Sequence, residues 1–269
     1  MTKPFLKSAG GKTQLLPQLR ALVPRKYGHY WEPFLGGGAL FFDIRPEFAT
    51  LCDMNYPLTQ AYLGVRDDVH GVCRRLALCK NNKEFFLRKR AAMPKMRNGT
   101  DPSHAEWAAW VIYLNKTCFN GLWRVNKKGE FNVPFAGNKN PMVHLDRDTL
   151  EVASMVLQKA QIYYGDFALI KPERGDFVYF DPPYAPLTAT SDFTSYTKEK
   201  FGVSDQVRLR DFMLALKKRG VHVLLSNSSG PLIRGLYAGD QFKITEVNAR
   251  RSINSAGDKR GNVKELLIQ

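Results

Sequence analysis

The sequence predicts an α/β fold with a Rossmann-like sheet. Two observations lead to this prediction. Short apolar segments alternate with helical stretches over residues 1–57 and again over residues 146–269, and a glycine turn, LGGG, joins the first apolar segment to a helix. Residues 58–145 differ in composition and are expected to form a mostly helical insert after the second strand. A chain of 269 residues can bury one good core with at most a small satellite domain.

Each predicted strand is a short apolar run with a polar or glycine-rich segment after it. The runs lie within residues 29–34, 48–53, 159–167, 175–184 and 221–227. A helix over residues 204–220 is expected to precede the last of them. Ser204 can cap its N-terminus, Lys217 and Arg219 favour its C-terminal dipole, and Gly220 ends it.

The insert carries a helix and then a segment of another kind. In PSHAEWAAWVIYLNK, Ser103 and Glu106 form a capping box, and apolar residues recur at i, i+3, i+4 and i+7 from Trp107. The segment that follows, TCFNGLWRVNKKGEFNVPF, is rich in turn formers, basic residues and aromatic residues. A hairpin or loop is expected there.

The chain is strongly basic, with 40 Lys and Arg against 25 Asp and Glu, a net charge of +15 and a pI of about 9.7. Between residues 58 and 145 basic residues outnumber acidic ones by 15 to 6. Such a distribution favours a polyanionic partner, most often nucleic acid, although a merely solvated basic face would give the same count.

The sequence gives no indication of a membrane protein or of a metal site. No apolar run approaches the roughly 20 residues that span a bilayer, and the polar N-terminus is unlike a signal peptide, so a cytoplasmic protein is expected. The four cysteines lack a CxxC pair and any His/Cys spacing that suits zinc. No metal is expected, and the thiols are expected to be reduced.

The segment FLKSAGGKTQLL contains GGKT, which is similar to the end of a phosphate-binding P-loop. That motif requires glycine at the position of Leu6, and no apolar strand leads into the segment, so a P-loop ATPase is rejected. A zinc nucleobase deaminase is rejected because its signature requires PCxxC as well as HxE, and PCxxC is absent. A cytosine-C5 methyltransferase is rejected because no Pro-Cys pair occurs.

Two features indicate a site for a nucleoside-like cofactor. EPFLGGGAL places Gly36 and Gly38 between a strand and a helix, where a ligand can approach the backbone and meets the positive pole of the helix. Asp53 ends the next strand, 17 residues after Gly36, where it can accept hydrogen bonds from ribose hydroxyls. Each feature alone is weak, because glycine turns and strand-ending aspartates are common.

The decisive motif is DPPY, which follows the apolar run FVYF. The Asp181 carboxylate and the Pro182 carbonyl form a double acceptor suited to an amino group, and Pro182 and Pro183 fix the loop. Tyr184 can stack on a planar base. Two hydrogen bonds from the amino group of adenine would favour a pyramidal nitrogen, whose lone pair can attack the methyl group of a sulfonium donor. The alternative is a Pro-Pro turn with a capping aspartate.

With these motifs in place, the chain resembles the Dam-type (D12 class) DNA adenine-N6 methyltransferases, which use S-adenosylmethionine. The resemblance covers nearly the whole length and rests on FLKSAGGK, EPFLGGGAL, CDMN, FNGLWRVNKKGEFNVPF, DPPYAPL and RRSINS. It implies a methyltransferase sheet over 1–57 and 146–269, and an inserted target-recognition domain over 58–145. It also implies duplex DNA as substrate, GATC as the target, S-adenosylhomocysteine as product, and a monomer associated with the nucleoid.

The resemblance assigns the donor site residue by residue. Lys12 binds the donor or pairs with an acid beside it, and Asp53 and Asp181 also match donor ligands of the family. The family's tryptophan corresponds to Ser8, which removes an aromatic wall and leaves hydroxyl or backbone contacts. The remaining expected neighbours of the donor are Glu32, Phe34, Gly36, Gly38, Asp166 and Phe167.

The resemblance also assigns contacts to DNA. Arg124 can donate to guanine O6 and N7, Lys7 matches a lysine that reads the outer guanine, and the alternative for Arg124 is a solvated side chain. Phe119 and Asn120 match residues that enter the stack beside a flipped adenine, although Phe119 could instead be a core residue. Further expected contacts are Leu122 and Pro134 to a thymine methyl, Asn126, and Arg250, Arg251, Lys259 and Arg260 to phosphates.

Two alternatives stay open. An RNA or protein N-methyltransferase can carry a loop like DPPY, but is not expected to carry the NGLWR and FNVPF segments. A catalytically inactive DNA-binding relative would account for Ser8, but the intact Asp181 to Tyr184 loop argues against it.

Overall fold

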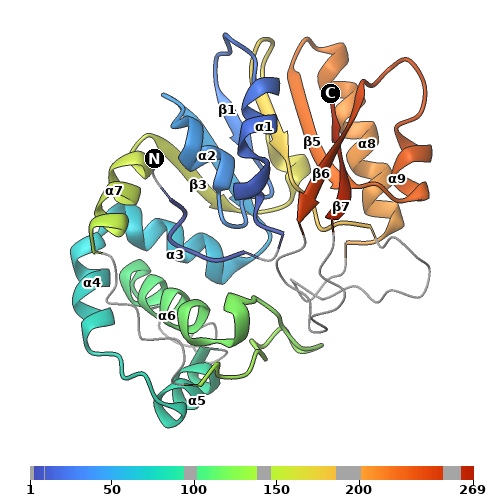
Figure 1. Ribbon diagram of the computed structural model, residues 1–269. Coiled ribbons are helices and arrows are strands. Elements are labelled where there is room, and N and C mark those ends of the chain that lie inside the picture. Colours follow the sequence, from blue (N-terminus) through green and yellow to red (C-terminus); the bar gives the residue numbers. More distant parts are fainter. Residues whose placement is uncertain (1–2, 9, 94–101, 138–146, 186–200, 251–261) are drawn as a thin grey trace.

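A seven-stranded mixed sheet forms the centre of the molecule, which confirms the predicted α/β class (Figure 1). The computed structural model describes residues 3–8, 10–93, 102–137, 147–185, 201–250 and 262–269. The strand order is β3-β2-β1-β4-β5-β7-β6. The first five strands pair in parallel, and β7 is antiparallel to both of its neighbours. The strands are β1 (Tyr30–Glu32), β2 (Ala49–Asp53), β3 (Ala160–Tyr164), β4 (Phe177–Phe180), β5 (His222–Ser228), β6 (Ile244–Arg250) and β7 (Asn262–Ile268).

The strand order reverses between β1 and β4. The chain builds outward from β1 through β2 to β3, then returns to the other side of β1 and continues through β4 to β5. In open α/β sheets, ligands bind beyond the carboxyl ends of the strands at such a switch point. The glycine turn after β1 and the DPPY loop after β4 therefore leave the sheet side by side.

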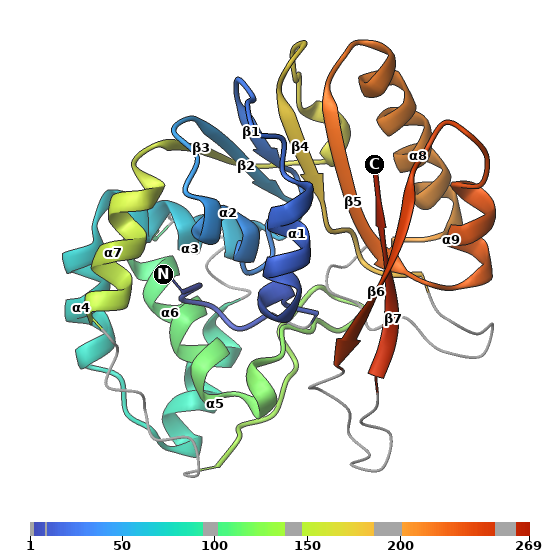
Figure 2. The ribbon, with the colours of Figure 1, turned by 45° about the horizontal axis from the view of Figure 1, so that its top comes forward.

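Alternating residues of β4, β5 and β7 enter two hydrophobic clusters, one on each face of the sheet. In β4, Phe177 and Tyr179 join the cluster that includes the buried residues of α1 to α7, whereas Val178 and Phe180 join the cluster of α8 and α9. Both faces are thus covered, as Figures 1 and 2 show. The helices are α1 (Leu16–Leu22), α2 (Ala39–Ile44), α3 (Tyr56–Asp67), α4 (Val69–Ala77), α5 (Lys83–Ala92), α6 (His104–Thr117), α7 (Arg147–Leu157), α8 (Val203–Lys218) and α9 (Pro231–Leu236), with short 3-10 turns η1 (Lys12–Leu15), η3 (Phe119–Gly121) and η4 (Phe167–Leu169).

Between β2 and α7, the described residues form the helices α3 to α6 and a segment of another kind after α6. Ser103 caps α6 and accepts a hydrogen bond from the backbone N–H of Glu106 at 3.3 Å. The segment after α6 forms antiparallel bridges between Cys118 and Phe135 and between Val125 and Phe131, which confirms the hairpin expectation. The apolar residues of α3 to α6 belong to the same cluster as one face of the sheet.

Helix α8 begins earlier than predicted, and Ser204 is not its cap. The helix starts at Val203, and Gly202 holds the N-cap position. The carboxylate of Asp205, in the first turn, accepts the N–H of the N-cap residue Gly202 at 2.9 Å, which is the N3 side-chain bond of a capping box. Gly220 ends the helix as predicted, with φ of 80°.

The antiparallel pair β6 and β7 was not predicted from the sequence. Arg250, which was predicted to contact phosphates, is the last residue of β6 and pairs with Asn262. None of the helices in the described parts of the chain is both long and apolar enough to cross a bilayer.

Close packing of α3 on α6 generates a test of this fold. A Cβ on Gly64 would lie 2.1 Å from the backbone oxygen of His104 and 2.6 Å from the Cβ of Ala108. We expect Gly64→Ala to lower the free energy of unfolding by about 1–3 kcal/mol, because backbone must shift to admit the methyl group. Urea unfolding measures the change.

The matched control is Gly235→Ala in α9, where an added Cβ meets open space. This variant should be neutral or more stable by up to about 1 kcal/mol, because alanine has the higher helix propensity. Equal stabilities of the two variants would contradict the packing argument.

Candidate active site

The acids predicted from sequence lie along one edge of the sheet. Glu32 ends β1, Asp53 ends β2, and Asp166 and Asp181 follow β3 and β4 within two residues. Because these four parallel strands are adjacent, their carboxyl ends meet at the same edge. The structure therefore brings the predicted acids to one site.

Asp181, which is partly exposed, forms an ion pair with the buried Lys12. The Lys12 ammonium lies 2.8 Å from Oδ1 of Asp181, donates to the Gly10 carbonyl at 2.7 Å, and is 4.6 Å from the ring centre of Tyr184. Only 4% of Lys12 is exposed, so it is held in the site and not extended into solvent as a surface phosphate clamp. Burial raises the pKa of Asp181 to about 6, and the nearby Lys12 charge acts in the opposite direction.

Asp53 joins the glycine turn to the start of α3. One carboxylate oxygen accepts the N–H of Gly36 at 3.0 Å and the other accepts the N–H of Asn55 at 2.8 Å. Gly36 has φ of 47°, and its carbonyl accepts from the Tyr62 hydroxyl at 3.0 Å. Burial raises the pKa of Asp53 to about 6, while both backbone donors lower it. The turn is thus held in the open shape that a ligand needs.

Glu32 is buried beneath this turn. The Tyr30 hydroxyl donates to its Oε2 atom at 2.8 Å. Burial raises the pKa of Glu32 to about 8, although the Tyr30 bond lowers it, so the side chain is mostly protonated at pH 7. A neutral acid here can donate as well as accept a hydrogen bond.

Phe34, Asp166 and Phe167 lie together with Arg208, a residue that was not predicted from the sequence. The Phe34 and Phe167 rings are stacked with centroids 5.4 Å apart. Arg208 of α8 binds both carboxylate oxygens of Asp166 at 2.8 Å and lies 4.3 Å from the Phe167 ring centre. Phe167 is itself buried, so Phe34 and Arg208 cover it. Arg208 carried no local signal, because only the fold brings it to Asp166.

Further missed residues fix the DPPY loop from behind. Gln206 of α8 donates to the Pro183 carbonyl at 3.0 Å and accepts from the Asn227 side chain at 3.0 Å. Ser228 donates its hydroxyl to the Ala185 carbonyl at 2.9 Å. Gln206 and Asn227 are fully buried. The polar residues at the end of the run VHVLLSN could have indicated these contacts, because a buried amide at the end of a strand needs hydrogen-bond partners.

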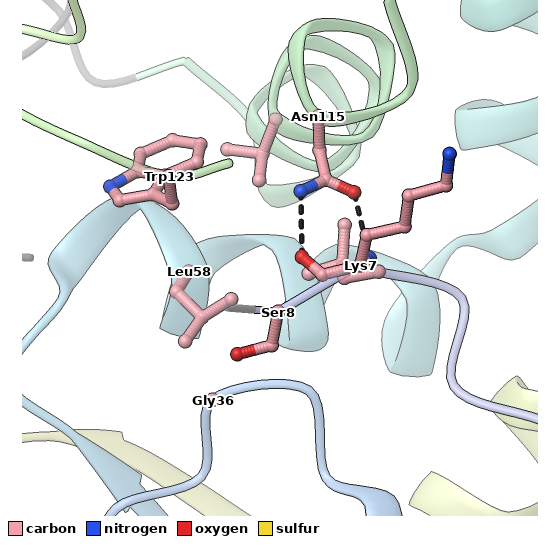
Figure 3. Close-up of a pocket in the computed structure, with 8 residues that line it drawn as sticks. Lys7, Ser8, Gly36, Leu58, Asn115 and Trp123 are labelled. Atoms are coloured by element: carbon pink, nitrogen blue, oxygen red, sulfur yellow. Dashed lines mark hydrogen bonds between the residues drawn. The ribbon is translucent and has the colours of Figure 1, made fainter. Parts of the chain in front are cut away.

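Ser8 lines a small pocket between the N-terminal segment and α6, shown in Figure 3. A Cβ on Gly37 would lie 3.2 Å from that of Ser8, so this serine packs on the glycine turn. Beside it, the Asn115 side chain accepts the N–H of Lys7 and donates to the carbonyl of Lys7, both at 2.8 Å. The pocket is lined by Leu6, Lys7, Ser8, Gly36, Leu58, Val111, Asn115 and Trp123.

The residues of the hairpin that were predicted to contact DNA differ in exposure and in hydrogen bonding. Phe119 is 46% exposed, so it is not a core residue. Arg124 donates from Nε to Asn132 at 2.8 Å, so its guanidinium is oriented and not freely solvated. Asn120 has the left-handed φ of 55°, which turns the chain sharply between Phe119 and Gly121.

Some of the other residues predicted to contact DNA form hydrogen bonds or packing contacts within the protein. Asn126 builds the hairpin turn: its side chain accepts the N–H groups of Lys128 and Glu130 and donates to the Glu130 carboxylate. Leu122 packs on the core, and Pro134 is exposed. Arg251, Lys259 and Arg260 lie outside the described residues.

The buried Glu32 predicts a pH-dependent stability. Between the ordinary pKa of 4.5 and the folded value of about 8, the folded chain holds a proton that the unfolded chain releases, so stability falls as the pH rises. Glu32→Gln removes this proton exchange. We expect the variant to gain stability relative to the wild type from about pH 5 to about pH 8, and the difference to level off above that.

Urea unfolding at several pH values measures the difference. Glu47→Gln, at an exposed acid, is the control and should follow the wild type. A Glu32→Gln variant with the wild-type pH dependence would contradict a protonated Glu32.

Comparison with known proteins gives a family and close relatives. Residues 8–253 match the family of D12 class N6 adenine-specific DNA methyltransferases. The chain is 43% identical to the type II methyltransferase M1.LlaDCHI of Lactococcus lactis, over 99% of this chain and 94% of that protein. It is also 43% identical to the type II methyltransferase M.MjaIII of Methanocaldococcus jannaschii, over 99% and 98%.

The Escherichia coli K12 DNA adenine methylase is 35% identical, over 98% of this chain and 93% of that protein. These matches span the glycine turn, the DPPY loop and the hairpin alike, and they agree with the sheet and with the acids gathered at its edge. The chain belongs to the D12 class of N6 adenine-specific DNA methyltransferases.

Proposed function

We propose that the enzyme transfers a methyl group from S-adenosylmethionine to N6 of an adenine flipped out of duplex DNA, in the sequence GATC. The observation that carries this proposal is the state of the DPPY loop. Gln206 donates a hydrogen bond to the Pro183 carbonyl, and Ser228 donates one to the Ala185 carbonyl. Lys12 forms an ion pair with one carboxylate oxygen of Asp181. Within the described residues, the Pro182 carbonyl has no such donor, so it can serve with Asp181 as the acceptor pair for an incoming amino group.

The residues at the sheet edge fit the donor that the family implies. Gly36 and Gly38 have positive φ and leave backbone room beside Asp53, whose carboxylate can accept from ribose hydroxyls. Phe34 offers an apolar surface to a planar ring. We assign Lys12, Glu32, Phe34, Gly36, Gly38, Asp53, Asp166 and Phe167 to this site, with Ser8 at its margin. When bound, S-adenosylmethionine supplies an electrophilic methyl group on a sulfonium centre.

In the proposed mechanism, the protein acts on the target nitrogen. The Asp181 carboxylate and the Pro182 carbonyl accept two hydrogen bonds from N6, which draws the lone pair out of conjugation with the ring. The Tyr184 ring stacks on the flipped base and orients N6. Asp181 accepts best when ionised, and its pKa of about 6 places that state above mildly acidic pH.

We further propose that residues 58–145 act as the inserted target-recognition domain. Support comes from the excess of basic residues in this region and from the hairpin, which presents the exposed Phe119 beside the oriented Arg124. Lys7 lies against Gly121 of the same hairpin: a Cβ on Gly121 would meet the Lys7 side chain at 2.5 Å. The enzyme would work as a monomer, without a metal, at the nucleoid in the cytoplasm, where its DNA substrate lies.

Substitution of Asp181 tests the mechanism. Asp181→Ala should abolish transfer of labelled methyl groups while leaving DNA affinity largely unchanged, because the acceptor is lost but the DNA-contacting hairpin is not. Filter-bound label and a gel-shift titration measure the two quantities. Asp240→Ala, at an exposed position, is the control. Retained turnover in a folded Asp181→Ala protein would refute the mechanism.

Substitution of Arg124 tests the target sequence. With oligonucleotides that carry GATC or its single-base variants, the wild type should methylate GATC alone. Arg124→Ala should lose about 1–3 kcal/mol of discrimination at one guanine. Lys127→Ala, an exposed base on the same hairpin, should weaken binding to all duplexes alike. An unchanged sequence preference in Arg124→Ala would overturn the role of this residue.

A further inference from the structure

Tyr184 of the DPPY loop is tied to an acid that none of the motifs contains. Its hydroxyl donates to Oε2 of Glu265 at 2.7 Å. Glu265 lies on β7, where it pairs with Ser228 of β5 and with Val247 of β6. The acceptor is therefore carried by a strand with a neighbour on each side, which positions a side chain more precisely than a loop does.

The alternation of β7 directs Glu265 into the site. Leu266 and Ile268 enter the cluster beneath α8 and α9, and Leu267 enters the cluster on the opposite face. Glu265 shares its face with Leu267, whereas Lys264 lies on the other and forms an ion pair with Glu246. A carboxylate is thus placed beside Tyr184, and among the described residues it takes no part in the ion pair between β6 and β7.

Two contacts fix the Tyr184 ring. Glu265 holds the hydroxyl at one end, and the Lys12 ammonium lies 4.6 Å from the ring centre while it pairs with Asp181. A hydrogen bond from a phenol to a carboxylate is about twice as strong as one between neutral groups. It restricts rotation of the ring about its two side-chain torsions.

We propose that Glu265 is a positioning residue for methyl transfer: it holds the Tyr184 ring at the angle at which the target adenine stacks, so that N6 reaches Asp181 and Pro182. This inference rests on the stacking role proposed for Tyr184. Glu265 itself need not touch either substrate. Its contribution should appear in the rate of the chemical step and not in the affinity for DNA.

A double-mutant cycle tests the proposal with the full chain. Single-turnover rates are measured at saturating S-adenosylmethionine and saturating GATC duplex for Glu265→Ala, Tyr184→Phe and the double variant. Each single variant should lower the rate about tenfold, because a charge-assisted hydrogen bond is lost, with the KM for DNA changed less than about threefold. The double variant should be no slower than Tyr184→Phe alone, since both changes remove one bond.

Two further variants separate positioning from general destabilisation. Glu265→Gln keeps an acceptor oxygen and should recover most of the rate. Glu246→Ala removes an exposed acid of the neighbouring strand and should leave the rate unchanged. If Glu265→Ala unfolds below the assay temperature, the test relies on Tyr184→Phe, because this variant removes the Tyr184–Glu265 hydrogen bond and keeps the aromatic ring.

A wild-type rate in Tyr184→Phe or in Glu265→Ala overturns the proposal. So does a loss from Glu265→Ala that is undiminished in the Tyr184→Phe background. Tyr184→Ala distinguishes failure of the underlying mechanism: if removing the whole ring also leaves the rate unchanged, the stacking role of Tyr184 is wrong. If only Tyr184→Ala is slow, the ring matters and its tie to Glu265 does not.

Discussion

The ion pair between the buried Lys12 and Asp181 is the interaction on which the site depends. It joins a lysine near the N-terminus to the loop after β4, and it brings the N-terminal segment across the switch point of the sheet. Such a pair is not a large source of net stability, but loss of Asp181 would leave the buried Lys12 charge uncompensated. The geometry of the DPPY loop and the path of the N-terminal segment are therefore set together.

The sequence predicted the parts of this arrangement that have local causes. The glycine turn, Asp53 and DPPY follow apolar strands directly, and Ser103 caps α6 because a serine before an apolar helical pattern has few other roles. Ser204 failed as a cap because the helix begins at Val203, so Gly202 is the N-cap and Ser204 lies in the first turn. A sequence pattern does not locate a helix end to better than one or two residues.

What could not be predicted are contacts that only the tertiary fold creates. Arg208 meets Asp166 across 42 positions, and Tyr184 meets Glu265 across 81. Nothing in the composition around Arg208 or Glu265 distinguishes them from solvated surface charges. Strands β6 and β7 were missed for a related reason: they mix polar and apolar residues without a regular alternation, and such short runs are ambiguous without their partners.

The position of β7 between β5 and β6 has a consequence for how the protein is made. β7 follows every other strand in the chain, yet β6 joins the sheet only through it. During translation, the edge of β5 that pairs with β7 stays unpaired until residues 262–269 have left the ribosome. Strand β6 also has no strand to pair with until then. The same strand delivers Glu265 to Tyr184. A nascent chain can thus make most of the residues of its core before the hydrogen bond between Tyr184 and Glu265 can form.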